Sequence, residues 1–510
     1  MRMLTLLAAL AFASVAAASD AFPILTPKPA PQPRINGPEV YGARPGRPFL
    51  YRIPCTGERP VRFSAAGLPN ALKLDAATGI ITGATPAKPG EYRVTLSAVN
   101  AQGKSVKRFR IVVGNTLALT PPMGWNDWYT HYDRISDRLM RQAADAMLRS
   151  GMADFGYQYV NIDDCWMVKP GSTVAELAGD PRAADGTIRS NGRFPDMKAL
   201  TAYIHAQGLK AGIYTSPGPL TCARFQGSYQ HEEQDARTFA GWGFDFLKYD
   251  LCSYRTVDTT GGRVAGTLEA DRKPYELMGG ILGKLDRDVV FNLCQYGRSE
   301  VWKWGGEVGG NCWRTTGDLG LEKSTRLPGF YSIGFKNAAA WEFAGPGKWN
   351  DPDYILIGAV GDAHAMNAPP AKAPLTADEQ YSYMSMWALM ASPLFYSGDM
   401  GALDEFTLNV LCNAEVIDVD QDSLGKQARV VRRTEDEFVL AKPLADGSVA
   451  VGLFNLSESG REMRATWQDL GIEGRRRTRD VWRQKDLGAV SGDYKATVPR
   501  HGVTLVRLIR

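Results

Sequence analysis

The sequence predicts a multidomain protein in which a central (β/α)8 barrel of the TIM-barrel type lies between an N-terminal and a C-terminal β-sandwich. The chain has 510 residues, more than a single hydrophobic core usually supports. Its pattern also changes twice: short alternating stretches fill residues 35–115, strand-like and helical stretches alternate over 117–424, and alternating stretches return over 425–510. A doubly wound parallel sheet is the alternative for the middle part.

The first 34 residues form no predicted core of their own. Residues 1–18 place Arg2 before an apolar stretch that ends in small residues, which is typical of a signal peptide. That stretch is too short to span a bilayer, so we expect a protein without a membrane span that is exported, to the periplasm or outside the cell. Residues 19–34 contain five prolines and predict an extended linker.

Residues 35–115 predict a small β-sandwich. Apolar and polar residues alternate over 49–53, 92–98 and 108–113, and Gly, Pro and Asn turns separate these stretches. The segment from Ser64 to Gly83 resembles the immunoglobulin-like (Ig-like) modules that bacterial secreted proteins carry. Such a module can bind glycans or cell surfaces, but we favour a spacer or packing role because a fold does not by itself imply a function.

The middle part alternates between strands and helices, as a parallel sheet requires. Predicted strands cover residues 157–162, 210–214, 244–249 and 289–293. Predicted helices cover residues 136–149, 195–206 and 233–242, and Ser136 is a suitable N-cap. Beyond residue 425, strands are predicted at 429–432, 438–443 and 449–455, with Asp446 and Gly447 in a hairpin turn.

Carboxylates, aromatic residues and bases follow the predicted barrel strands. They include Asp127 and Trp128, Asp163 and Asp164, Lys248 and Asp250, Arg314 and Asp318, and Asp351 and Asp353. Because the C-terminal ends of barrel strands converge on one mouth, these residues are expected to form one site.

Carboxylates grouped with tryptophan, without a phosphate-binding loop, indicate glycosidic-bond chemistry. One carboxylate then acts at the anomeric carbon while another protonates the leaving oxygen. A divalent cation at Asp163 and Asp164 is one alternative, and structural ion pairing is another. The five histidines show no ligand spacing, so we expect no metal and no cofactor. The 59 Lys and Arg residues nearly balance the 55 Asp and Glu residues, which argues against nucleic acid as a partner.

Six segments resemble, in the same order, the signature segments of glycoside hydrolase family 27, the α-galactosidase or melibiase family. They are residues 121–126 (PPMGWN), 161–166 (NIDDCW), 212–214 (GIY), 248–250 (KYD), 313–318 (WRTTGD) and 349–353 (WNDPD). Residues 418–425 (DVDQDSLG) resemble the junction between barrel and sandwich in that family. The resemblance implies a retaining exo-α-galactosidase that releases terminal α-D-galactosyl residues by a two-carboxylate double displacement, with carbohydrate as its partner and no cofactor.

The same resemblance implies a role for each site residue. Asp250 is the expected nucleophile and Asp318 the expected general acid/base, with their carboxyl groups about 5–5.5 Å apart, as retention requires. Lys248 is expected to keep Asp250 ionised, and Asp163 and Asp164 are expected to bind the 4- and 6-hydroxyls of galactose. The other expected substrate-binding residues are Trp128, Tyr214, Lys248, Gln295, Arg314 and Asp353.

The seven cysteines are an odd number, so at least one stays unpaired or pairs between chains. The resemblance implies two disulfides, Cys222–Cys252 and Cys294–Cys312. Cys165 is expected to be free or buried, and Cys55 and Cys412 have no evident partner.

One departure from the family lies at residues 294–297 (CQYG), where many relatives have Cys-Glu-Trp. This loop is expected to face the 2-substituent of the sugar, so α-N-acetylgalactosaminidase activity stays open. β-L-Arabinopyranosidase and isomalto-dextranase activities also occur on this scaffold. Outside this family's chemistry, the alternatives are a carbohydrate-binding protein without catalysis and a metal-dependent barrel hydrolase.

Overall fold

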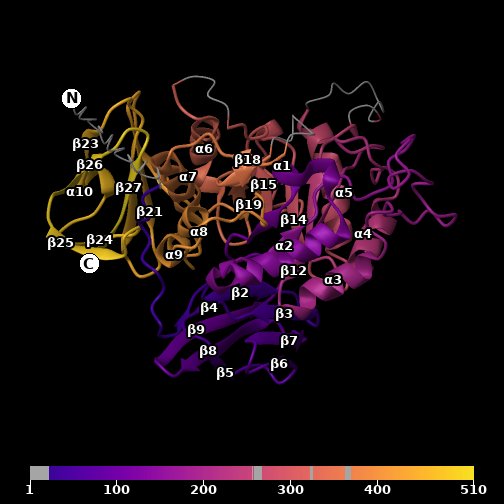
Figure 1. The fold of residues 1–510 in the computed structure, drawn as a ribbon, viewed down its shortest axis with the longest axis horizontal. Helices are drawn as coiled ribbons and strands as arrows, with labels where there is room; N and C mark the ends of the chain where they lie inside the picture. The colour runs from indigo at the N-terminus through magenta and orange to yellow at the C-terminus, as the bar shows by residue number, and fades with distance from the viewer. Residues whose placement is uncertain (1–21, 255–256, 258–266, 322–325, 362–368) are drawn as a thin grey trace, which may run out of the picture.

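The computed structural model describes residues 22–254, 257, 267–321, 326–361 and 369–510. These residues form three bodies, a barrel flanked by two β domains, and so confirm the predicted fold class (Figure 1). The predicted signal peptide, residues 1–18, lies outside the described residues. No helix in the described part of the chain is long and apolar enough to cross a bilayer.

The central body is built on an eight-stranded parallel sheet. Its strands follow the order β16-β15-β14-β13-β12-β11-β10-β19, and a parallel bridge between Ile355 and Tyr396 links the segment after β16 to β19. The sheet therefore closes on itself as a barrel does. The strands are β10 (Met123–Asn126), β11 (Tyr159–Asn161), β12 (Lys210–Thr215), β13 (Phe246–Asp250), β14 (Val290–Cys294), β15 (Cys312–Arg314), β16 (Trp349–Asp351) and β19 (Leu394–Tyr396).

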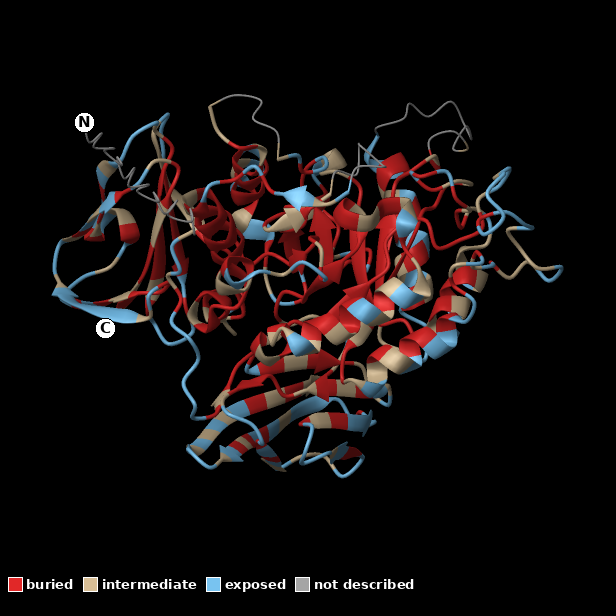
Figure 2. Ribbon diagram, viewed as in Figure 1, coloured by how far each residue is buried: buried red, intermediate tan, exposed pale blue. Residues whose placement is uncertain are grey.

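The helices surround this sheet and turn their buried sides towards it (Figure 2). Ser136 caps α2 as predicted, because its side chain accepts a hydrogen bond from the N–H of Leu139. A capping box of Thr376 and Glu379 starts α7. The helices are α1 (Trp128–His131), α2 (Asp137–Arg149), α3 (Met197–Ala206), α4 (Glu232–Trp242), α5 (Leu268–Leu282), α6 (Gly329–Ala339), α7 (Ala377–Leu389), α8 (Glu405–Leu411) and α9 (Ala414–Asp420).

The N-terminal body is a sandwich of a four-stranded sheet, ordered β2-β9-β8-β5, and a three-stranded sheet, ordered β3-β7-β6. Every second residue of β8 from Val94 to Ala98 is buried between the sheets, which gives this body its own core. The β2–β9 pair is parallel, whereas the other pairs within these two sheets are antiparallel. The strands are β2 (Val40–Ala43), β3 (Pro48–Arg52), β5 (Arg62–Ala66), β6 (Leu72–Leu74), β7 (Ile80–Ala84), β8 (Gly90–Asn100) and β9 (Gly103–Val113); β1 (Arg34–Ile35) pairs with β4 (Cys55–Thr56) beside them.

Arg44 joins the N-terminal body to the barrel. Its guanidinium donates hydrogen bonds to the carbonyl oxygens of Leu282 and Gly283, 3.2 and 2.8 Å away, where α5 ends. It also forms a 2.6 Å ion pair with Asp288. Because the last carbonyls of a helix lack partners within the helix, a cation at this position satisfies them directly.

The first part of the Pro-rich segment lies against the barrel, whereas residues 27–32 are exposed. We call residues 22–26 the strap. The backbone N–H groups of Leu25 and Thr26 donate to Asn409 Oδ1 of α8, at 3.2 and 3.1 Å, and Thr26 Oγ1 donates to the Asn409 carbonyl oxygen at 2.9 Å.

The C-terminal body shares the core of the barrel. In β21, Phe438 and Leu440 pack with the barrel core, while Val439 and Ala441 face a separate core of this domain. Gly447 makes the predicted turn with a φ of 79°. The main sheet has the order β20-β21-β22-β27-β24-β25, and β23 pairs with β26. The elements are β20 (Arg429–Arg433), β21 (Glu437–Pro443), β22 (Val449–Asn455), β23 (Arg461–Thr466), α10 (Trp467–Leu470), β24 (Arg476–Asp480), β25 (Lys485–Val490), β26 (Asp493–Val498) and β27 (Val503–Ile509).

Candidate active site

The expected site residues lie at the C-terminal ends of the barrel strands. Strand register aligns Tyr214 with Lys248, and Asp250 with Cys294. Asp163 and Asp164 follow β11, Asp318 follows β15 and Asp353 follows β16. The contacts described below connect these residues across six neighbouring strands, β11 to β16. Segments far apart in sequence meet there, as in the 224-residue separation between Tyr129 and Asp353.

Asp250, the expected nucleophile, is almost fully buried at the end of β13. Its Oδ1 accepts hydrogen bonds from the backbone N–H of Leu251 at 2.8 Å and from the hydroxyl of Tyr296 at 2.5 Å. Burial raises the pKa of Asp250, and the Lys248 charge and the Tyr296 hydroxyl oppose that rise. Its Oδ2 accepts no hydrogen bond from the residues that the structure describes, and so it is the oxygen left for a substrate.

The charge of Lys248 favours the ionised form of Asp250, as expected, but the carboxylate that Lys248 contacts directly is a different one. Its ammonium forms a 2.7 Å ion pair with Asp163 Oδ2. Residues i and i+2 of a strand share one face, so Lys248 and Asp250 both point into the barrel, and the ammonium then reaches across to the next strand but one. Lys248 therefore acts on Asp250 through space and on Asp163 by direct contact.

Asp163 and Asp164, the expected ligands of the 4- and 6-hydroxyls, are both held by several donors. Asp163 Oδ2 also accepts hydrogen bonds from Asn126 Nδ2 at 2.9 Å and from the Tyr354 hydroxyl at 3.0 Å. Asp164 Oδ2 accepts one from the N–H of Ala223 at 2.9 Å. Burial raises the pKa of Asp164 to about 6. Both carboxylates are thus fixed in direction before any ligand arrives.

Asp318, the expected general acid/base, is more exposed to solvent than Asp250. Its side chain is 44% exposed, whereas Asp250 is 5% exposed. Arg314 Nη2 lies 3.2 Å from Asp318 Oδ1 and 2.9 Å from Asp353 Oδ2, so one guanidinium links both carboxylates. The negative charge of Asp318 also disfavours ionisation of Asp250 and so adds to the rise in the pKa of that buried carboxyl group.

Asp353 is fixed from several sides. Its Oδ2 accepts hydrogen bonds from the Tyr129 hydroxyl and from the N–H of Leu319, both at 2.9 Å. Its backbone has a φ of 87°, in the left-handed region that non-glycine residues rarely adopt. Burial raises the pKa of Asp353 to about 6 against the opposing charge of Arg314. Strained backbone of this kind is concentrated at functional sites.

Aromatic side chains surround the Lys248 ammonium. It lies 5.2 Å from the ring centre of Tyr214, 5.3 Å from that of Tyr354 and 5.8 Å from that of Trp128. Trp128 is partly exposed and so can offer a face to a sugar ring, whereas Tyr214 is fully buried. Two further tryptophans near the site are fully buried and hydrogen-bonded through their indole N–H groups, which gives them a packing role; they are Trp125 and Trp166.

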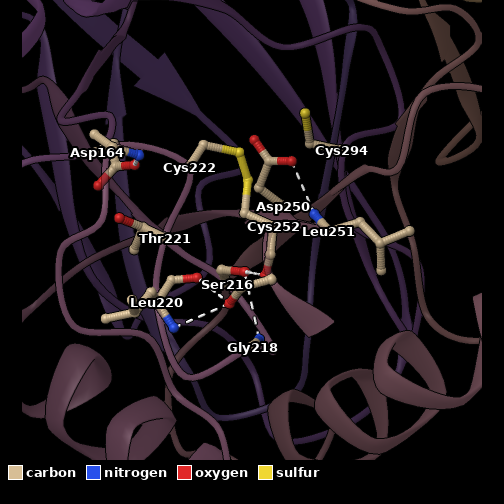
Figure 3. The surroundings of a disulfide bond; sticks show 12 residues. Asp164, Ser216, Gly218, Leu220, Thr221, Cys222, Asp250, Leu251, Cys252 and Cys294 are labelled. Carbon is tan, nitrogen blue, oxygen red and sulfur yellow. Dashed lines mark hydrogen bonds between the residues drawn. A yellow bond between two sulfur atoms is a disulfide. The ribbon is translucent and has the colours of Figure 1, made fainter. Parts of the chain in front are cut away.

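The disulfide between Cys222 and Cys252 is formed, with a Cα–Cα distance of 5.0 Å. Figure 3 shows it beside the carboxyl group of Asp250. One oxygen of that carboxyl group and the two sulfurs lie within 4.8 Å of one another. The bridge ties the loop after β12 to the residues that follow β13, and the same loop supplies the Ala223 N–H that binds Asp164.

The second expected disulfide, Cys294–Cys312, is wrong, because both cysteines are free and buried. The β14–β15 register pairs Cys312 with Asn292, so Cys294 lies two residues farther along the neighbouring strand. Strand geometry then puts the two Cα atoms roughly 8 Å apart, beyond the reach of a disulfide. Cys312 Sγ instead accepts a hydrogen bond from Asn292 Nδ2 at 3.2 Å. The other free and buried cysteines are Cys55, Cys165 and Cys412.

The segment at residues 294–297 brings to the site a residue that was not expected there, Tyr296. Gln295 is fully buried, and its Oε1 accepts a hydrogen bond from the N–H of Arg298 at 2.7 Å within the same loop. The next residue, Tyr296, reaches Asp250. Sequence reasoning missed Tyr296 and also Tyr354 as contacts of the carboxylates. Their positions directly after Gln295 and Asp353 were the available signal.

Comparison with known proteins gives one consistent family. A family model described as Alpha galactosidase A matches residues 120–422, one for its C-terminal beta sandwich domain matches residues 435–508, and one for an Ig domain matches residues 32–114. The chain is 37% identical over 410 residues to an alpha-galactosidase of Cyamopsis tetragonoloba, covering 79% of this chain and 89% of that protein. It is 33% identical over 413 residues to Alpha-galactosidase A of Cellvibrio japonicus, covering 77% and 92%.

Two solved structures show how far the likeness extends. A candidate alpha-galactosidase of Bacteroides fragilis superposes with a TM-score of 0.84 at 34% identity, covering 96% of this chain and 99% of that one. A β-L-arabinopyranosidase of Geobacillus stearothermophilus superposes with a TM-score of 0.66 at 25% identity, covering 77% and 98%. The first likeness therefore extends over nearly the whole chain, the N-terminal body included, whereas the second spans about three quarters of it.

Proposed function

The chain belongs to the alpha galactosidase A family of glycoside hydrolases, and from that premise we propose that it removes terminal α-D-galactosyl residues from carbohydrates by exo cleavage with retention of configuration. One observation carries the proposal: buried Asp250 keeps one carboxylate oxygen free at the barrel mouth, within electrostatic reach of the half-exposed Asp318. A buried nucleophile and a more open proton donor are what a retaining mechanism requires.

The first step is attack by Asp250 on the anomeric carbon. A lone pair of Oδ2 forms the new C–O bond while the glycosidic C–O bond breaks, and Asp318 gives its proton to the leaving oxygen. In the second step the Asp318 carboxylate takes a proton from water, the water oxygen bonds to the anomeric carbon, and Asp250 leaves as a carboxylate. Two inversions give net retention.

Selectivity for galactose is assigned to Asp163 and Asp164. Because Lys248 and the Ala223 N–H hold these carboxylates in place, they can accept hydrogen bonds only from hydroxyls in a set direction. A sugar with an equatorial 4-hydroxyl would leave a buried carboxylate without its donor, which typically costs ~1–3 kcal/mol or more. Export of the protein is also part of the proposal and rests on residues 1–18 alone.

The proposal can be tested by determining the anomeric configuration of the products. We expect NMR of a 4-nitrophenyl α-galactoside digest to show α-galactose as the first product, before mutarotation. Asp250→Gly should lose hydrolysis, and added azide should restore turnover and give β-galactosyl azide, because azide attacks from the face that the missing carboxylate occupied.

Asp318→Gly is the matched control. With azide it should give α-galactosyl azide, since the covalent step on Asp250 is intact. Galactose released first as the β-anomer, or an Asp250→Gly enzyme with undiminished hydrolysis, would overturn the proposal. The enzyme could also prefer the α-N-acetylgalactosaminide, the β-L-arabinopyranoside or the isomaltoside to the α-galactoside. That result would change the proposed substrate but not the proposed mechanism.

A further inference from the structure

We propose that Tyr296 is a positioning residue for the reaction, which holds one oxygen of Asp250 so that the other faces the anomeric carbon. The inference rests on the proposed function, because it takes Asp250 as the nucleophile. Neither the signature segments nor the expected substrate contacts include this tyrosine.

Both hydrogen bonds to Asp250 converge on the same oxygen. The Tyr296 hydroxyl donates to Oδ1 at 2.5 Å, and the Leu251 N–H donates to Oδ1 at 2.8 Å. Two donors on one oxygen fix the rotation of the carboxyl group about its χ2 bond, which is otherwise broad. Oδ2 is then presented without a competing donor from the described residues.

The backbone fixes where the Tyr296 hydroxyl lies. Tyr296 has a φ of 67° and Gly297 a φ of 76°, so the chain turns sharply after β14. The N–H of Gly297 donates to the Arg314 carbonyl oxygen at 2.9 Å, and a side chain at this position would collide with the carbonyl oxygen of Thr315. The turn is thus locked against β15, and a rigid support of this kind is what precise positioning needs.

The surroundings leave Asp250 as the strongest acceptor for this hydroxyl. Among the described residues, the hydroxyl also contacts the disulfide sulfurs, Cys222 Sγ at 3.6 Å and Cys252 Sγ at 3.9 Å, and sulfur is a weak acceptor. Burial and then the neighbouring Asp250 charge raise the pKa of Tyr296 far above its ordinary value. The phenol therefore keeps its proton and stays a donor at every working pH.

The hydrogen bond has a role in both chemical steps. When Oδ2 bonds to the anomeric carbon, Oδ1 becomes the carbonyl oxygen of the ester and keeps the phenol as its donor. When Asp250 leaves, negative charge returns to Oδ1, and a hydrogen bond to a charged acceptor is stronger than one to a neutral acceptor.

The charge on Asp250 depends on several groups from different elements. Lys248 on the same strand and the Tyr296 hydroxyl favour the carboxylate, while Asp318 and Asp163 disfavour it. Three further titratable side chains interact with it, namely Tyr214, Tyr275 and Cys294. Loss of the Tyr296 hydroxyl removes one of the groups that favour the carboxylate, so the pKa of Asp250 should rise further.

The experiment compares Tyr296→Phe with Tyr249→Phe. The Tyr249 hydroxyl is buried in β13, one residue before Asp250, and has no hydrogen-bond partner among the described residues, so its loss should change neither rate nor pH profile. Tyr296→Phe should lower kcat/KM for 4-nitrophenyl α-galactoside about tenfold, which corresponds to ~1.4 kcal/mol, as expected for a lost bond to a charged group. It should also move the acid limb of the kcat/KM profile to higher pH, because the nucleophile must be ionised.

A second variant guards against misfolding. Tyr296→Leu has no donor group and should show the same shift of the acid limb as Tyr296→Phe, and a melting temperature near that of the wild type shows that each variant is folded. An acid limb at the wild-type pH in both variants would overturn the positioning role. If Asp250→Gly meanwhile still gives β-galactosyl azide, only the inference about Tyr296 fails, and the proposed function stands.

Discussion

Lys248 shows that closeness in sequence does not fix which charges pair. It lies two residues before Asp250 on one face of β13, yet its ammonium contacts Asp163 at 2.7 Å. A flexible four-carbon side chain can reach either carboxylate. The choice is set by Asn126 and Tyr354, which direct their donors at the same Asp163 oxygen and so fix its position. The arrangement depends on residues from three separate segments of the chain, and the linear sequence does not show that they meet.

Removing this ammonium should destabilise the fold and abolish galactose binding. Lys248→Met leaves the Asp163 carboxylate buried without its cation, so we expect the free energy of unfolding to fall by about 3–5 kcal/mol. Urea denaturation followed by tryptophan fluorescence measures this. The double variant Asp163→Asn/Lys248→Met should recover a large part of the loss, because no unpaired charge remains. Equal losses in the single and double variants would contradict the pairing.

Site residues could be predicted where the residue type and its position at a strand end are enough. They could not be predicted where a long side chain contacts a group far from its own backbone. The carboxylates after β11, β13, β15 and β16 could be named in advance because barrel strand ends converge. Tyr296 and Tyr354 could not, since a tyrosine hydroxyl acts far from its own backbone. The pairing of Cys294 with Cys312 failed for a related reason: which residues stand opposite each other depends on strand register, which spacing along the chain does not reveal.

At the scale of elements, the loop after β12 is held by the Cys222–Cys252 bridge. In the same loop, the Ala223 N–H donates a hydrogen bond to Asp164, so we expect the disulfide to affect substrate recognition as well as stability. Helix and strand assignments were predictable at this scale because periodicity and capping are local. Ser136 caps α2 and Gly447 turns the hairpin as the pattern indicates.

Opening the bridge should therefore have two effects. Cys222→Ala/Cys252→Ala frees a loop of 30 residues, and loop entropy gives a loss of about 3–4 kcal/mol in the free energy of unfolding. We also expect KM for galactosides to rise severalfold, because Asp164 loses a fixed donor. Thermal unfolding and initial rates measure the two effects. Cys412→Ala, which removes a buried free thiol, is the control and should leave KM unchanged. An unaltered KM in the double variant would show that the loop after β12 does not contribute to substrate recognition.

At the scale of the whole molecule, the N-terminal body is built into the barrel. Arg44 binds the end of α5 and pairs with Asp288, with side-chain exposures of only 12% and 18%. The three-body fold class was predictable from the changes of pattern along the chain. The contacts between the bodies were not, because an arginine that caps a distant helix looks like any surface arginine in sequence.

Arg44→Ala should weaken this joint without altering catalysis. We expect a loss of about 2–4 kcal/mol, because a half-buried carboxylate and several carbonyls lose their donor. The matched control is Arg47→Ala, whose partner Asp286 is 97% exposed, and it should change stability by less than ~1 kcal/mol. Calorimetry measures both, and kcat should stay at the wild-type value in each. Equal effects of the two substitutions would show that the joint does not depend on Arg44.

The strap imposes an order on how the chain is completed. Thr26 leaves the ribosome 383 residues before Asn409, to which its backbone is bonded. At roughly 5–20 residues per second, translation separates the two by about 20–80 s. During that interval the strap, residues 22–26, has no α8 to bind, while the Ig-like body that follows it already has a complete core of its own. Attachment of the strap is thus among the last events of maturation, after nearly the whole barrel has been synthesised.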